Sequence, residues 1–153
     1  MPEVRIRRAR EVDAAAMAAV VAGAFAPFEA LTGVRPAPLR TDWPTVVSAL
    51  GARVATRDDA VVGVLVLWPH PDHVLVETVA VAPEAQGSGI GALLLDVAER
   101  EAMEAGLNAV RLSTNAAMTE NLNWYPRRGY VEVGRGLEHG YDRVRFEKRL
   151  LPL

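Results

Sequence analysis

Apolar residues alternate with polar ones in some stretches of this chain and recur every three to four positions in others. Short runs with strand character cover residues 4–8, 52–56, 60–68, 74–82, 109–114, 130–137 and 141–150. Helical spacing or helix composition covers residues 13–26, 44–50, 90–105 and 119–128. The pattern therefore predicts an α/β (α+β) fold in the order strand, one or two helices, three strands, helix, strand, helix and two strands.

Individual residues indicate where several of these elements begin and end. Asp13 is a candidate N-cap for the first helix, and Pro27 is expected to stop that helix. The segment 26–43 is predicted to be a loop with one short helical turn, which either covers the sheet edge or lines a substrate pocket. Asp42 is expected to cap the helix at 44–50, and Thr119 or Asn115 to cap the helix at 119–128. Gly106 is expected to end the helix that begins at 90.

Turn signals and helical spacing predict how the elements connect and pack. Residues 57–59 and 138–140 read as hairpin turns, and 69–72 turns the chain into the strand at 74–82. That strand, the next helix and the strand at 109–114 form a right-handed crossover, so the two strands should be parallel. The helix between them carries one apolar stripe for core packing: Ile90, Leu93, Leu94, Val97, Ala98 and Ala102.

Composition and charge exclude several classes of protein. The chain has 153 residues, 50% of them hydrophobic, a net charge of -2 and no cysteine. A general nucleic-acid binder is disfavoured by this charge, and disulfides and thiolate metal sites are excluded. The sequence shows no secretory signal, and no apolar run is judged long enough to span a membrane. We therefore expect one domain, residues 1–153, in the cytoplasm.

The most informative stretch is a strand, a glycine-rich turn and a helix N-terminus in direct succession. The strand at 74–82 ends at Pro83, and Gln86-Gly87-Ser88-Gly89-Ile90-Gly91 leads into the helix. Free N–H groups of the turn and the positive end of the helix dipole converge there, which suits a phosphate or pyrophosphate. Glycine is needed because a side chain would hold the backbone away from the anion. This stretch predicts a site for a nucleotide-bearing cofactor.

Three glycine-loop motifs compete for this stretch. A P-loop requires a lysine after the glycines, and none is present. The looser dinucleotide pattern fits residues 87–92, but the next strand ends in Ser113-Thr114 instead of an acidic residue. The third motif, Gln86-x-x-Gly89-x-Gly91 after Val-Ala-Val-Ala-Pro, resembles the acyl-CoA-binding motif of the GCN5-related N-acetyltransferase (GNAT) family. Tyr125-Pro126-Arg127-Arg128-Gly129-Tyr130 is similar to that family's Tyr-x-x-x-Gly-Phe/Tyr signature.

The resemblance extends over nearly the whole chain and implies a fold, a cofactor and a set of roles. It implies a central mixed, mostly antiparallel sheet flanked by helices, and transfer of an acetyl group from acetyl-CoA to a primary amine. It implies that backbone N–H groups of the loop bind the pyrophosphate, and that the strand around Val79 pairs with the pantetheine arm. The implied cofactor-binding residues are Val79, Ala80, Val81, Gln86, Gly87, Ser88, Gly89, Ile90, Gly91 and Ala92.

The resemblance also implies catalytic roles. Tyr125 is the candidate general acid for the leaving thiolate, with aromatic packing as the alternative. Glu77 is the candidate base through a bridging water, and a structural Glu with an Arg partner is the alternative. Glu29 is a second candidate base, and an amine arriving in its neutral form would need none. Many relatives carry Asn and Ala where this chain has Met118 and Asn121, so Asn121 or Asn115 is expected to contact the pantetheine.

Several alternatives stay open at the level of sequence. The chain is either an enzyme or an acyl-CoA-binding sensor without turnover, and a nucleotide-dependent oxidoreductase is the third class. The acceptor, a small molecule or a peptide amine, is not chosen by the sequence because acidic and basic residues both occur in the expected pocket segments. A homodimer through a sheet edge is an open alternative. His70 and His73 are expected to lie in a solvated turn, so no metal site is predicted.

Overall fold

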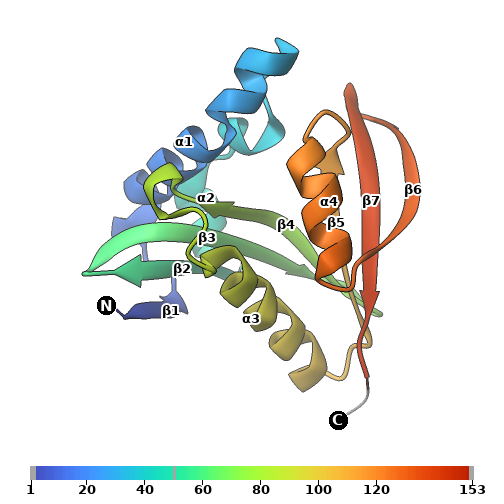
Figure 1. The fold of residues 1–153 in the computed structure, drawn as a ribbon. Helices are drawn as coiled ribbons and strands as arrows, with labels where there is room; N and C mark the ends of the chain where they lie inside the picture. The colour runs from blue at the N-terminus through green and yellow to red at the C-terminus, as the bar shows by residue number, and fades with distance from the viewer. Residues whose placement is uncertain (1–2, 50, 152–153) are drawn as a thin grey trace. The chain divides into compact units, whose positions relative to one another are not determined.

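The protein, described as a computed structural model over residues 3–49 and 51–151, contains the predicted elements in the predicted order (Figure 1). The strands are β1 Val4–Arg8, β2 Gly51–Arg57, β3 Ala60–Pro69, β4 Val74–Val81, β5 Ala109–Asn115, β6 Val131–Glu138 and β7 Tyr141–Arg149. The helices are α1 Ala14–Thr32, α2 Trp43–Ala49, α3 Ile90–Glu104 and α4 Thr119–Arg127, with 3-10 turns η1 Glu11–Asp13, η2 Ala37–Arg40 and η3 Pro83–Ala85. The predicted end of the second helix at Leu50 lies outside the described residues.

The strands follow the order β1-β2-β3-β4-β5-β7-β6. The pairs β1–β2, β2–β3, β5–β7 and β6–β7 are antiparallel, and β4–β5 is parallel. The mixed, mostly antiparallel sheet is therefore confirmed, and so is the parallel crossover through α3.

The chain divides into two units, which we describe separately. The first comprises Met1–Leu67 and Thr78–Asp96, and the second comprises Trp68–Glu77 and Val97–Leu153. The division runs through β3, β4 and α3, because each of these elements contributes residues to both units. That the whole chain is one domain stays a prediction.

In the first unit, the start of α3 packs closely on the β2–β3 hairpin. Asp58 and Asp59 form its turn with φ of 52° and 63°, values that Asp tolerates better than most residues. A Cβ atom on Gly63 of β3 would lie 3.1 Å from side-chain atoms of both Ile90 and Leu94. Glycine at position 63 thus lets the first turn of α3 approach the sheet, and this fixes where the helix N-terminus lies.

Helix α1 is longer than the sequence indicated. Pro27 was expected to stop it, but the helix continues to Thr32 and ends at Gly33, whose φ is 70° and whose N–H bonds to the Glu29 carbonyl. The prediction of a loop over residues 26–32 is therefore wrong, whereas the expected helical turn is η2. Proline removes one backbone hydrogen bond, and the residues after it still form a helix up to the glycine C-cap.

The length of α1 also bears on whether a helix of this chain is long enough to span a membrane. Within the helical segment Glu11–Thr32, an 18-residue window has a mean hydropathy of 1.7, enough by length and composition alone to cross a membrane, and 22% of that window is buried. The prediction that no apolar run is long enough to span a membrane is therefore wrong for this segment. Met17, Val20 and Val21 of this helix are buried, although most of the apolar window is not. Cytoplasmic localisation stays a prediction.

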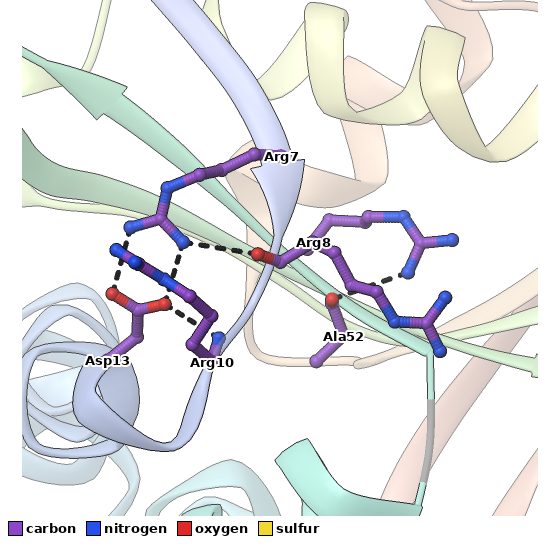
Figure 2. A network of polar contacts seen from close by, with 6 residues as sticks. Arg7, Arg8, Arg10, Asp13 and Ala52 are labelled. Atoms are coloured by element: carbon purple, nitrogen blue, oxygen red, sulfur yellow. Dashed lines mark hydrogen bonds and ion pairs between the residues drawn. The ribbon is translucent and has the colours of Figure 1, made fainter.

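Asp13 stabilises the turn before α1 instead of capping α1 itself. Its side chain makes no cap bond to the helix. The carboxylate accepts two hydrogen bonds from the Arg7 guanidinium, at 2.8 and 2.9 Å, and one from the Arg10 N–H at 2.7 Å (Figure 2). These bonds lower the pKa of Asp13 from 3.8 to about 2, with the Arg7 bonds as the largest cause. The buried carboxylate thus ties β1 to the start of α1.

Replacing Asp13 with asparagine is expected to lower the free energy of unfolding at pH 7 by about 1–2 kcal/mol, a value reduced because Arg7 is partly exposed. The pKa is lower in the folded state, so this stabilisation is present above pH 4 and is lost as the pH falls towards 2. Urea unfolding at pH 7 and pH 2.5 measures it. Glu132→Gln removes an exposed pair with Arg135 and should cost less; an equal loss in both variants would contradict this account.

The second unit is built on the β5–β7–β6 sheet, with α4 beside it (Figure 1). The β6–β7 hairpin turns at His139 and Gly140, with φ of 51° and 83°. Residues Val144 and Phe146 of β7 are buried, as is Tyr130, whose hydroxyl donates to Glu99 of α3. The core of this unit therefore lies between the sheet and the helices α3 and α4.

Two local predictions about the later helices need correction. Leu93 of the predicted stripe is 43% exposed, and Leu95, which was not predicted, is buried, so the buried side of α3 lies closer to Leu95. Helix α4 begins after Met118 without a side-chain cap, so neither Thr119 nor Asn115 caps it. The Asn115 side-chain amide oxygen instead accepts the Ala117 N–H at 2.8 Å. The predicted stop of α3 at Gly106, with φ of 76°, is correct.

Candidate functional site

The glycine loop of the first unit has the conformation that only glycine adopts readily. Gly87 and Gly89 have φ of 81° and 86°. A Cβ atom at either position would meet no atom within 4 Å, so the space above both residues is open. These glycines are therefore required by the backbone conformation, and a side chain would occupy the space in which a ligand approaches the loop.

Free backbone donors lie at the end of this loop. The first α-helical bond of α3 runs from the Leu93 N–H to the Gly89 carbonyl at 3.1 Å. The N–H groups of Ile90, Gly91 and Ala92 consequently have no acceptor within the helix. Ile90 as a whole residue is 1% exposed and anchors the helix in the core, whereas Gly91 and Ala92 are partly exposed. The loop and the helix dipole together present several N–H donors to an anion.

Side chains within the loop stabilise its shape. The Gln86 amide donates to the Val81 carbonyl at 3.0 Å, and the Ser88 hydroxyl donates to the Ala85 carbonyl. Pro83 packs against α1, because a Cβ atom on Gly23 would lie 3.1 Å from the proline ring. The loop is thus fixed before any ligand binds.

The end of β4 offers free backbone along an edge. Ala80 is buried, whereas Val79 and Val81 alternate onto the more exposed face. Among the described residues, β5 pairs with β4 only at Val74, Leu75 and Val76, although β4 continues to Val81. The backbone of residues 77–81 therefore has no β5 partner in this register. The Val81 carbonyl is already used by Gln86.

Glu77 and Tyr125 belong to the second unit. Glu77 is exposed, on the same strand face as Leu75, and it forms no ion pair with any residue that the structure describes. The alternative of a structural Glu with an Arg partner is therefore not supported. Glu29, the second candidate base, lies on α1 and pairs with Arg35 at 3.6 Å.

Tyr125 is buried, and its hydroxyl makes no hydrogen bond within the described residues. The ring packs against Tyr130 and Phe146, with centroids 5.9 and 5.7 Å apart. Burial of the ring raises the pKa of Tyr125 well above its usual value, which keeps the phenol protonated.

Asn121 is partly committed to the protein itself. Its amide nitrogen donates to the Thr114 hydroxyl at 3.1 Å and approaches the Met118 sulfur at 3.5 Å. The Thr114 hydroxyl contacts the same sulfur at 3.3 Å, and Thr114 and Met118 are both buried. This cluster joins the start of α4 to the end of β5. Thr114 was not singled out from the sequence, because its role depends on the approach of α4.

The predicted site residues fall into two sets that belong to different units. The glycine loop and Val79, Ala80 and Val81 lie in the first, and Glu77, Asn121 and Tyr125 in the second. His70 and His73 stack with ring centroids 4.4 Å apart, and His73 pairs with Asp72. Over residues 3–49 and 51–151, no group of three or more potential metal ligands is found.

Strand order, glycine loop and tyrosine together define an acyl-CoA acyltransferase class of fold. A model of the acetyltransferase (GNAT) family matches residues 19–130, and the chain belongs to this family. The resemblance drawn from the sequence motifs is thereby confirmed.

Two proteins named as acetyltransferases are similar in sequence to parts of this chain. Mycothiol acetyltransferase from Pseudarthrobacter chlorophenolicus is 38% identical over 71 residues, which are 46% of this chain and 22% of that protein. Aminoalkylphosphonate N-acetyltransferase from Salmonella typhimurium is 36% identical over 86 residues, 52% of this chain and 56% of that protein. The chain thus spans less than two thirds of either relative.

The fold is confirmed by a solved structure, the PaiA N-acetyltransferase from Thermoplasma acidophilum in complex with coenzyme A. It superposes with a TM-score of 0.79 at 17% identity, covering 96% of this chain and 99% of that chain. At this identity the likeness concerns the fold.

Proposed function

We propose that the protein is an N-acetyltransferase that moves the acetyl group of acetyl-CoA to a primary amine by direct transfer. The observation that carries the proposal is the glycine loop at the N-terminus of α3, with its open space and free N–H donors. Family membership supports the same function, and the relative from Thermoplasma acidophilum is a complex with coenzyme A.

In this proposal acetyl-CoA is held by backbone groups of the first unit. N–H groups of the loop and of Ile90, Gly91 and Ala92 bind the pyrophosphate. The pantetheine amides pair with the free side of β4 at Val79 to Val81, and the Val79 N–H polarises the thioester carbonyl. The open positions above Gly87 and Gly89 fit this use, because a Cβ there would obstruct the phosphates.

The catalytic roles are assigned to Glu77 and Tyr125 in this proposal. Glu77 removes a proton from the ammonium form of the acceptor through a bridging water, and the neutral amine attacks the carbonyl carbon. The new N–C bond forms as the C–S bond breaks, and Tyr125 donates its phenolic proton to the leaving sulfur. The nitrogen loses its second proton to solvent as the amide forms, and a proton from solvent restores the phenol of Tyr125. Asn121 contacts the pantetheine through its amide oxygen, since its nitrogen already bonds to Thr114.

The acceptor is a small-molecule amine in this proposal. Both relatives are named for small-molecule acetylation, one of them for aminoalkylphosphonates. A peptide amine is the alternative, which an acceptor screen distinguishes.

Release of free thiol from acetyl-CoA, measured with and without amines, tests the function. We expect release that depends on the amine, with one acetylated product per thiol. Binding of acetyl-CoA without release for any small-molecule or peptide amine would favour the sensor alternative and contradict the enzyme.

Replacing Glu77 with glutamine is expected to lower kcat/KM near neutral pH by about 10²-fold, the lower end for general base catalysis. The loss should shrink at high pH, where the amine arrives neutral. Glu84→Gln, an exposed change in η3, is the control. An unchanged pH–rate profile in the Glu77 variant would show that no dedicated base acts at this position.

A further inference from the structure

One face of the sheet in the second unit is polar and rich in arginine. Residues paired directly across strands share a face, so Ser113 pairs with Arg145 and Asn115 with Arg143 on this side. Val144 and Phe146 point to the opposite, buried face, where Tyr125 packs. The full set on the polar face of β5 and β7 is Arg111, Ser113, Asn115, Tyr141, Arg143, Arg145, Glu147 and Arg149.

The guanidinium of Arg145 is held in a fixed place on this face. It donates to Glu138 at 2.6 Å. A Cβ atom on Gly134 of β6 would lie 2.6 Å from an Arg145 terminal nitrogen, so a larger residue there would displace the end of the Arg145 side chain. The register of β6 and β7 shifts between Glu132 and Gly134, which brings Gly134 opposite Arg145. Arg145 is therefore positioned by a local irregularity of the hairpin.

Arg143 is positioned beside it but is only weakly neutralised. Its guanidinium carbon lies 5.3 Å from the centre of the Tyr141 ring, and a terminal nitrogen is 4.0 Å from Glu138. Gly136 pairs with Arg143 across β6 and β7, and a Cβ there would meet nothing within 4 Å. Open space therefore adjoins the two arginines.

The charge on this face is not balanced. Arg143 and Arg145 share the one carboxylate of Glu138, and Arg111 and Arg149 share that of Glu147. Asp72, which interacts electrostatically with Arg111, and Glu77 of β4 add negative charge on the Arg111 side. The excess of positive charge therefore lies at Arg143 and Arg145, which share Glu138. Arginine side chains that already lie in a fixed geometry bind a carboxylate or phosphonate by paired, charge-assisted hydrogen bonds.

We infer that Arg143 and Arg145 bind an anionic group, a carboxylate or phosphonate, carried by the amine acceptor. The inference rests on the proposed function and names the class of its acceptor. Glu77 belongs to the same unit, on the strand face that Leu75 shares with Arg111. β4 and β7 lie on either side of β5, so strand spacing places them roughly 10 Å apart. An arginine side chain reaches across part of this distance, and a molecule the size of a small amino acid spans the rest.

Matched acceptors test this inference: 4-aminobutyrate against 4-aminobutyramide, and 3-aminopropylphosphonate against its dimethyl ester. We expect kcat/KM to favour the charged member of a pair by on the order of 10- to 100-fold. Arg143→Gln should abolish this preference, and Arg145→Lys should reduce it, because lysine keeps the charge without the planar fork. Arg149→Gln, on the same strand and 70% exposed, should preserve it. Acetyl-CoA affinity should be unchanged in all three variants.

A second readout does not require turnover. In NMR spectra of the native protein, the Nε–H signals of Arg143 and Arg145 should shift with 3-aminopropylphosphonate and not with its ester, while that of Arg149 stays in place. Equal use of charged and neutral amines, or no shift with either anion, would overturn the inference and leave the acetyltransferase intact. Shifts without any acetyl transfer would support the anion site and contradict the proposed function.

Discussion

Replacing Tyr125 with phenylalanine is expected to lower kcat by about 10²- to 10⁴-fold, the contribution of a positioned general acid. Acetyl-CoA affinity and folding stability should change little. The ring contacts with Tyr130 and Phe146 survive the substitution, and the hydroxyl makes no hydrogen bond within the described residues that its removal would break. Steady-state kinetics, together with titration of acetyl-CoA and urea unfolding, separates these effects.

Tyr130→Phe is the matched control, because it removes the same atom from a neighbouring ring. That hydroxyl donates to Glu99 at 3.0 Å, so its loss should cost about 1 kcal/mol of stability and leave kcat nearly unchanged. If Tyr125→Phe had native kcat with an acceptor that the native protein acetylates, Tyr125 would be a packing residue and the acid assignment would be wrong.

The pH dependence of the reaction offers a further check on Tyr125. Burial raises the pKa of its phenol, and the protonated form is the one that donates. Tyr125 should therefore stay competent throughout the range below pH 10. Any decline of kcat/KM between pH 6 and 10 must then come from the titration of another group. The pH–rate profile of Tyr125→Phe should therefore have the same shape as that of the native protein.

Replacing Gly89 with alanine is expected to weaken acetyl-CoA binding by on the order of 10- to 100-fold, the value of one or two hydrogen bonds to a charged group. At φ of 86° the alanine strains the loop, and its methyl group occupies the open space above the backbone donors. Isothermal titration with acetyl-CoA measures the change.

Gly106→Ala separates strain from ligand contact. Gly106 lies at the other end of α3 with φ of 76°, and a Cβ there also meets nothing within 4 Å. Both variants should lose about 1–2 kcal/mol of stability from the left-handed conformation. Only Gly89→Ala should lose affinity; equal affinities in the two variants would mean that the loop does not contact the cofactor.

Sequence patterns located strands and turns well because their signals are local. Alternating residues gave β1, and Asp58-Asp59 and His139-Gly140 marked turns that require positive φ. The predicted end of α1 at Pro27 is wrong because one missing N–H does not end a helix, and the C-cap glycine, Gly33, lies further along the chain. Asp13 was assigned a cap, yet its carboxylate reaches back to Arg7, a partner that only the packing of β1 beside α1 supplies.

The candidate site was predictable to a similar extent. The glycine loop carries its own conformational requirement, so its residues were found directly from the motif. Arg143 and Arg145 were not found, because their meeting with Glu138 depends on the β6–β7 register and on the room left by Gly134. Likewise, the cluster of Thr114, Met118 and Asn121 forms only when α4 packs on β5.

Isothermal titration of the purified protein with acetyl-CoA, with NADH as the control ligand, tests the central claim most directly. We predict saturable binding of acetyl-CoA at one site per chain and no binding of NADH. Absence of binding to acetyl-CoA and to a longer acyl-CoA would contradict the account, because the loop would then be only a glycine turn that begins a core helix. Binding of NADH instead would assign the loop to a dinucleotide.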